Sequence, residues 1–127
     1  MELDLTLPRD SRASALARRA LSSWRPDDVP PGILDDVELL ASELIANSVR
    51  HAPTHGDASE IVLHARMVGP RVRVEVIDPG PGFEHVVQEP DPLQTNGRGL
   101  YLLDVLADRW GIEKRPSTCV WFELERH

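Results

Sequence analysis

The first part of the chain predicts one strand followed by two helices. Leucines occupy every second position from 3 to 7, which is the period of a half-buried strand, and a proline ends the pattern. From a cap at Asp10 or Ser11, apolar residues recur with helical spacing as far as Trp24. After a proline-rich loop, residues 33–51 show the pattern of a second helix, which a following proline closes.

The middle of the chain predicts a β-hairpin and then a long loop. Residues 60–68 and 71–77 have strand patterns, and the Gly69-Pro70 pair between them is typical of a tight turn. Residues 79–97 are rich in proline and glycine and show no periodicity. Long loops of this kind are more often functional than merely connecting, so this one is a candidate lid.

The last part predicts a helix over about 98–108 and short strands near 109–114 and 118–125. Because helices and strands do not alternate strictly, we expect a two-layer α/β (α+β) sandwich. Its sheet would be mixed, mostly antiparallel, with the helices packed on one face. A length of 127 residues suits one domain, so residues 1–127 are expected to form a single unit.

Charge and composition narrow the classes of function. A net charge of −7 disfavours direct binding to a phosphate backbone, so nucleic acid is not an expected partner. The first residues are acidic where a signal peptide needs basic ones, and no apolar run reaches the roughly 20 residues of a membrane span. We therefore expect a cytoplasmic protein without membrane contact. Cys119 is the only cysteine, which excludes an intrachain disulfide, and its apolar neighbours predict a buried thiol.

Within the helix over 33–51, two polar residues have spacing suited to chemistry. Glu43 and Asn47 are four residues apart and share a face at the margin of the apolar side. A carboxylate there can accept a proton from a hydroxyl, and an amide oxygen can ligate Mg²⁺. Taken in isolation, the pair also fits an ordinary helix in which Glu43 is solvated and Asn47 hydrogen-bonds locally. The side expected to pack on the sheet holds Leu34, Val37, Ala41, Leu44, Ile45, Ser48 and Val49.

Two glycine-containing segments could approach a ligand through their backbone. Asp78 follows a strand directly, and a buried carboxylate at this point could accept the exocyclic amine of adenine; a proline-glycine turn capped by aspartate is the alternative. The Gly97-Arg98-Gly99 turn precedes a helix, whose first N–H groups favour an anion such as phosphate, although an ordinary helix start fits as well. Neither segment is a Walker A loop or a dinucleotide fingerprint.

Taken in order, three segments resemble the N, G1 and G2 boxes of the gyrase/Hsp90/histidine-kinase/MutL ATPase superfamily. They are Glu43 to Asn47 (ELIAN), Asp78 to Gly82 (DPGPG) and Gly97 to Leu103 (GRGLYLL). Within the superfamily, the chain is most similar to anti-sigma-factor serine/threonine kinases in its small size and in the segment 102–110. The resemblance covers nearly the whole chain and implies a Bergerat-type ATP-binding fold.

The resemblance also implies roles for the first two boxes. Glu43 would be the general base and Asn47 the ligand of the Mg²⁺ that accompanies ATP. Asp78 would bind adenine, and Gly80 and Gly82 would shape the adenine pocket.

In the third box, Gly97 and Gly99 would cradle the phosphates, and Leu100 follows them in the same nucleotide-binding turn. Arg98 would approach the terminal phosphate or point instead to solvent or a partner. Residues 83–96 would form the ATP lid.

The chain departs from the family pattern before its last strand. Related sequences place a threonine there that supports the adenine-binding aspartate, whereas this chain has Ser117-Thr118-Cys119. If Cys119 takes that position the support is lost; a shift of one residue lets Thr118 serve.

By resemblance, the leading hypothesis is an ATP- and Mg²⁺-dependent protein serine/threonine kinase that phosphorylates a STAS-domain antagonist and controls a sigma factor. A non-catalytic module that sequesters a regulatory protein in a nucleotide-dependent way is the alternative. A detached histidine-kinase catalytic domain ranks last, because no histidine-bearing helical hairpin is present. A homodimer is also plausible, because a domain of this size leaves helix and sheet edges exposed.

Overall fold

The computed structural model describes residues 2–50, 60–78, 98–114 and 117–125. Their order of elements matches the prediction, while residues 79–97, with the expected lid, lie outside the described part. The elements are β1 (Glu2–Pro8), α1 (Ala13–Ser23), α2 (Pro31–Arg50), β2 (Glu60–Val68), β3 (Arg71–Asp78), α4 (Arg98–Leu106), β4 (Arg109–Lys114) and β5 (Thr118–Glu125).

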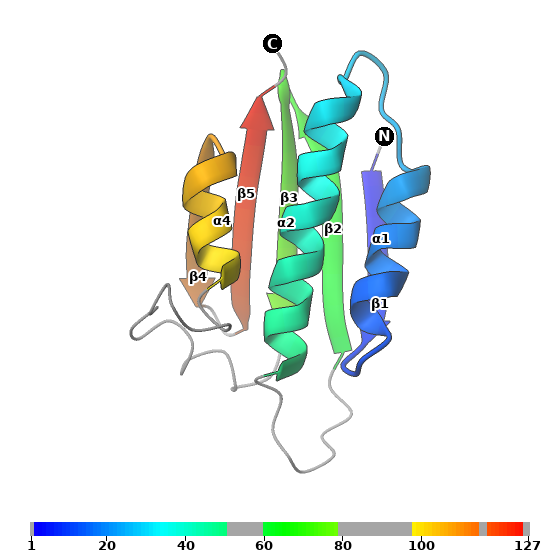
Figure 1. The fold of residues 1–127 in the computed structure, drawn as a ribbon, viewed down its shortest axis with the longest axis vertical. Coiled ribbons are helices and arrows are strands. Elements are labelled where there is room, and N and C mark those ends of the chain that lie inside the picture. Colours follow the sequence, from blue (N-terminus) through cyan, green and yellow to red (C-terminus); the bar gives the residue numbers. More distant parts are fainter. Residues whose placement is uncertain (1, 51–59, 79–97, 115–116, 126–127) are drawn as a thin grey trace.

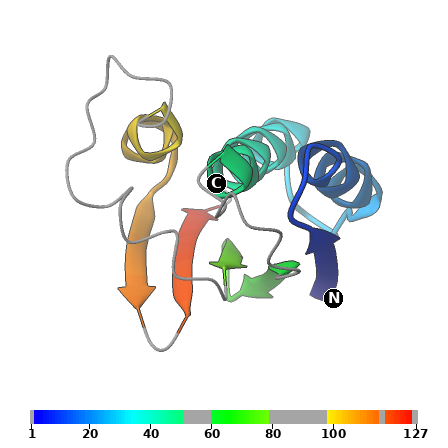
Figure 2. The same cartoon turned by 90° about the horizontal axis from the view of Figure 1, so that it is seen from below.

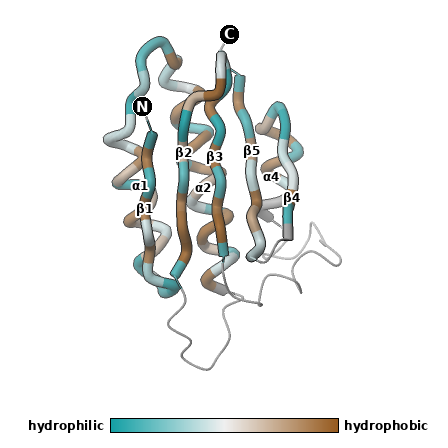
Figure 3. Tube along the Cα trace, turned by 180° about the vertical axis from the view of Figure 1, so that it is seen from behind, coloured by the Kyte–Doolittle hydropathy of each residue, from teal (hydrophilic) through white to brown (hydrophobic). Residues whose placement is uncertain are grey.

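The five strands form one sheet in the order β1-β2-β3-β5-β4, and every pairing is antiparallel. The helices α1, α2 and α4 all cover the same face (Figures 1 and 2). Figure 3 shows the opposite face, which no described helix covers. The two-layer α/β sandwich is therefore confirmed, with a sheet that is antiparallel throughout the described strands.

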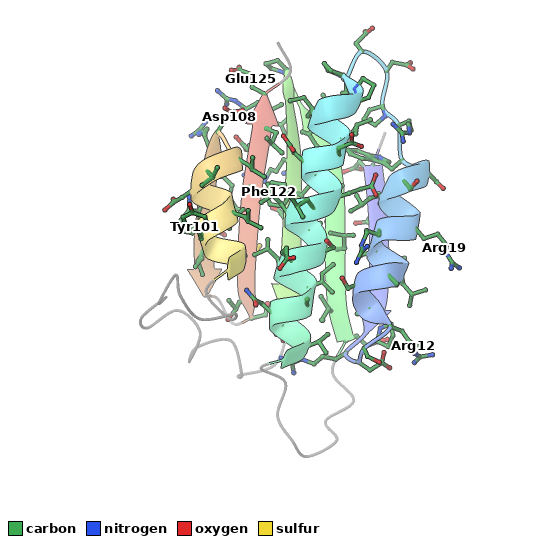
Figure 4. All side chains as sticks on the ribbon, in the orientation of Figure 1. Arg12, Arg19, Tyr101, Asp108, Phe122 and Glu125 are labelled. Carbon is green, nitrogen blue, oxygen red and sulfur yellow. The ribbon has the colours of Figure 1, made fainter. Side chains whose placement is uncertain are left out.

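The core fills the space between the sheet and the helices. Val72, Val74 and Val76 of β3 are fully buried, and they alternate with half-buried residues as the strand period requires. Phe122 of β5 points from the sheet into the same layer (Figure 4). Each such side chain contributes roughly 1.5–3 kcal/mol by leaving water. None of the described helices has the length and apolar character that crossing a membrane requires.

The predicted helix boundaries differ from the observed ones by a few residues, and α2 spans Pro31–Arg50 in place of the predicted 33–51. The first helix begins at Ala13, later than a cap at Asp10 or Ser11 would place it. The Asp10 carboxylate nevertheless accepts the backbone N–H of Arg12 at 2.8 Å, so it binds the chain just before the helix. The helix predicted over 98–108 ends at Leu106.

The buried side of α2 is wider than its apolar pattern predicted. Leu40 was not expected on the packed side, yet it is fully buried. The reason is tertiary, because α2 contacts α1 and α4 as well as the sheet, so more than one side of the helix is covered.

On the uncovered face of the sheet, an indole packs against a glycine and a guanidinium. The indole of Trp121 on β5 lies over Gly111, its partner on β4, and the Arg73 guanidinium stands 4.4 Å from the centre of the indole ring. A Cβ at Gly111 would approach the indole Nε1 to 2.8 Å, closer than packed atoms come. Glycine is therefore required at position 111 for Trp121 to lie where it does.

We expect Gly111→Ala to lower the free energy of unfolding by about 1–3 kcal/mol, because the added methyl overlaps the indole of Trp121. Urea denaturation followed by circular dichroism measures this change. Gly32→Ala is the matched control, since nothing lies within 4 Å of a Cβ at Gly32 and helical alanine is favourable. Equal stability of Gly111→Ala and wild type would contradict the expected overlap.

Cys119 lies on the uncovered face of the sheet and is half-buried, so the expectation of a fully buried thiol was only partly right. Its partners in the sheet are Ile77 on β3 and Glu113 on β4. Burial first, and then the carboxylates of Glu75 and Glu113, raise the pKa of the Cys119 thiol to about 11. The thiol is thus protonated at neutral pH and a poor nucleophile.

Alkylation by iodoacetamide should show this pKa directly. At pH 8 the folded protein should react about a hundredfold more slowly than protein unfolded in urea, because only the thiolate attacks. As pH rises, the rate for the unfolded chain should level off above about 8.5, whereas the rate for the folded chain should keep rising toward pH 11. Similar pH profiles in both states would show that the fold does not perturb the thiol.

Candidate functional site

One end of the sandwich collects the segments that the sequence singled out. The last residues of α2 and β3, and the first residues of α4 and β5, all lie at the lower end in Figure 1. Because β3 and β5 are antiparallel neighbours, the end of one strand lies beside the beginning of the other. This arrangement brings residues that are distant in the sequence to one end of the sheet.

Asp78 is the most buried charged residue at this end. It is the final residue of β3 and has 0% exposure. Its place in the strand period puts its side chain on the helix-facing side, the same side as Val74 and Val76. A carboxylate taken out of water in this way requires hydrogen-bond donors or a cation as compensation.

Arg9 and Ser48 contribute to that compensation. The Nη2 atom of Arg9 donates to both carboxylate oxygens of Asp78, at 2.7 Å to Oδ1 and 2.5 Å to Oδ2. The side chains of Arg9 and Asp78 are only 3% and 1% exposed. Ser48 of α2 donates its hydroxyl to Oδ2 at 2.5 Å. The carboxylate is therefore held by one strand end and one helix.

The pairing of β3 with β5 decides which residue stands opposite Asp78. The partner of Asp78 is Thr118, and the partner of Cys119 is Ile77. Paired residues project to the same side of a sheet, with Cβ atoms about 4.5–5.5 Å apart. Thr118 is buried on the helix side with Asp78, whereas Cys119 faces the other side. The position beside the aspartate thus belongs to a threonine.

Glu43 and Asn47 lie on α2 one turn apart, as their spacing predicted. Asn47 is 1% exposed and Glu43 is half-buried. Asn47 directly precedes Ser48, so it lies in the helical turn that contacts Asp78. Glu43 lies one turn farther from the end of the helix.

The glycine motifs are described only in part. Arg98, Gly99 and Leu100 form the first turn of α4, but the orientation of their side chains lies outside the described part of the structure. Gly80, Gly82 and Gly97 lie outside the described residues. Helix α4 packs against α2, so its first turn lies at the same end of the molecule as Asp78 (Figure 1).

This geometry suits a ligand with a polar heterocycle and an anionic group. Asp78 and Thr118 place a buried carboxylate beside a hydroxyl, which can accept and donate hydrogen bonds to a base. The first turn of α4 has backbone N–H groups without helical partners, which favour an anion. Helix α2 carries the amide of Asn47 in the turn that contacts Asp78 and the carboxylate of Glu43 one turn farther from its end.

Sequence reasoning missed Arg9 and placed Ser48 only in the packing surface. Ser48 carried a recognisable signal, because it is a polar residue within an otherwise apolar helix face and adjoins Asn47. Arg9 carried none, since a single basic residue after a strand has no pattern that indicates a partner 69 residues away.

Two curated relatives are similar to part of this chain. They are the serine-protein kinases RsbW of Listeria monocytogenes serotype 4a (strain HCC23) and serotype 4b (strain CLIP80459). Each is 28% identical over 59% of this chain and 55% of the relative. The chain therefore spans about half the length of the curated relatives it matches.

A family model matches far more of the chain. The model describes a histidine kinase-like ATPase domain and matches residues 7–124. The matched range begins at the end of β1 and stops one residue before the end of β5, so it includes every helix and strand between them. The chain therefore belongs to the histidine kinase-like ATPase domain family.

Proposed function

We propose that this chain binds ATP with Mg²⁺, transfers the γ-phosphoryl group to a serine or threonine hydroxyl of an antagonist protein, and thereby controls a sigma factor. One observation carries the proposal: the α2 turn with Asn47 adjoins the buried Asp78 through Ser48, at the end of the sheet where α4 begins. Membership of the ATPase family and similarity to serine-protein kinases support it.

Adenine recognition is assigned to Asp78. Its carboxylate would accept the exocyclic amine of the base, and Thr118 would contribute its hydroxyl from the neighbouring strand. Burial of both residues strengthens such hydrogen bonds, because the surroundings have a low dielectric constant.

The phosphates are assigned to the first turn of α4 and to Asn47. The N–H groups of that turn, with Gly97 and Gly99, would bind phosphate oxygens. The amide oxygen of Asn47 is a hard ligand of the kind that Mg²⁺ prefers, and the residue lies in the turn next to the base site. When bound, Mg²⁺ supplies neutralisation of the charge that develops on the phosphates.

Glu43 is assigned the role of general base. It lies one turn from Asn47, so its carboxylate would orient the attacking hydroxyl and accept its proton while the phosphates stay in place. The chemistry asks little more of the protein than positioning and charge stabilisation, which fits so small a set of residues.

A non-catalytic binding module that sequesters a regulatory protein is the second candidate function. The Arg9–Asp78 ion pair favours it, because a cation on the proposed adenine ligand weakens nucleotide binding. Phosphoryl transfer distinguishes the two candidates, since only the kinase labels its partner.

The proposed partners are a STAS-domain antagonist and a sigma factor in the cytoplasm, as the resemblance to anti-sigma-factor kinases implies. A homodimer is proposed as well. Among the described strands, β1 and β4 are the edges of the sheet, and their backbone groups can pair with another chain.

Isothermal titration with Mg·ATP tests the nucleotide site. The wild type should bind in the micromolar range, and both Asp78→Asn and Asn47→Ala should weaken binding at least about tenfold. Asp35→Asn, a change at an exposed position of α2, should leave the affinity unchanged. Circular dichroism verifies that each variant is folded. Undiminished binding by folded Asp78→Asn would contradict the assignment of the base site.

Phosphoryl transfer tests Glu43. With radiolabelled ATP and a purified STAS-domain antagonist, Glu43→Gln should keep ATP affinity within about twofold and slow labelling about 10²–10⁴-fold. Glu38→Gln is the matched control, because Glu38 lies on the same helix but about 140° around it. If Glu43→Gln labels the antagonist as fast as the control does, Glu43 is not the base.

A further inference from the structure

Arg9 is the feature of this site that the proposed function does not use. It follows β1, and β2 lies between β1 and β3, so the side chain reaches past one strand to contact Asp78. Its side chain is 3% exposed, unlike that of Arg12, which is 71% exposed in its pair with Asp10. Figure 4 shows Arg12 at the surface, beside the start of α1. A buried arginine so close to a proposed ligand-binding group bears on binding.

The position of the Arg9 nitrogen is specific. One atom, Nη2, lies 2.7 Å from Oδ1 and 2.5 Å from Oδ2 of Asp78, so it stands in front of the carboxylate, between its two oxygens. Ser48 takes a further position on Oδ2. A carboxylate has about four lone-pair sites, and the contacts with Arg9 and Ser48 use at least three of them.

An adenine amine would need the space and the lone pairs that Arg9 occupies. The amine is neutral, whereas the guanidinium forms a charge-assisted bond that is roughly twice as strong. The base therefore cannot reach Asp78 from the front unless the ion pair opens.

We propose that Arg9 competes with the nucleotide base for Asp78 and thereby sets a low affinity for ATP. The inference rests on the proposed ATP site. Arg9 is then a specificity-determining residue, because only a ligand whose other contacts offset the loss of the ion pair is retained. Under this proposal, binding of ATP moves the Arg9 side chain away from Asp78.

Titration of Arg9→Gln with Mg·ATP tests the competition. Glutamine is neutral and shorter than arginine, so it does not replace the cation at the Asp78 carboxylate. The affinity for Mg·ATP should therefore rise about ten- to a hundredfold over the wild type. Arg12→Gln is the matched control and should bind as the wild type does, because its ion pair is exposed. Equal or weaker binding by folded Arg9→Gln overturns the proposal and makes Arg9 a support of Asp78.

Removal of Arg9 takes this cation away from a buried carboxylate, which destabilises the protein. A measurement on the wild type therefore accompanies the one on the variant. In arginine-labelled protein, nitrogen NMR should show a guanidinium signal protected from exchange with water. Saturation with ATP should abolish that protection, and protection that persists overturns the proposal.

Failure of this inference can be distinguished from failure of the proposed function. If neither the wild type nor Arg9→Gln binds ATP, the proposed function fails, and the competition with it. If only Arg9→Gln binds detectably, the competition is supported, but the micromolar ATP binding proposed for the wild type is contradicted. If the wild type binds at Asp78, as loss in Asp78→Asn would show, and Arg9→Gln gains nothing, only the competition fails.

Discussion

The burial of one carboxylate is the constraint on which the described site depends. Asp78 has no exposed surface, and a charge in that position is tolerated only with donors at hydrogen-bond distance. The donors come from the end of β1 and from α2, at separations of 69 and 30 residues along the chain. The ion pair joins the end of the edge strand to the middle strand, and the Ser48 hydrogen bond joins the central helix to it. The same contacts that stabilise the fold also determine what the carboxylate can offer a ligand.

Helix α2 connects the two halves of the proposed site. Ser48 contacts Asp78, the carboxylate to which we assign the base. Asn47, its neighbour in the same turn, is the proposed Mg²⁺ ligand. Because the helix is packed against α1, α4, β3 and β5, it cannot turn or slide without disturbing several interfaces. Displacement of Ser48 from Asp78 would consequently displace Asn47 as well. The proposed base and metal sites would thus be mechanically coupled through a single turn of helix.

Much of the fold was predictable because it depends on local patterns. Alternation along β1, β3 and β5, helical spacing in α1 and α2, and the turn at Gly69, whose φ is 59°, each depend on a few neighbouring residues. Features set by tertiary contacts were not predictable. The burial of Leu40 depends on helix packing, the place of Thr118 depends on a strand register, and the contact of Arg9 depends on sheet order. In the site, the box residues were recognisable, but the cation beside Asp78 was not.

The strand order has a consequence for synthesis on the ribosome. β1, β2 and β3 are consecutive in the sequence and adjacent in the sheet, and α1 and α2 precede residue 78 as well. The portion up to residue 78 therefore contains three neighbouring antiparallel strands and two helices, together with Arg9 and Ser48, which donate to Asp78. The charge can be neutralised before β5 has left the exit tunnel. Until then, the free edge of β3 presents unpaired backbone groups with which another chain can pair, and pairing with β5 closes that edge.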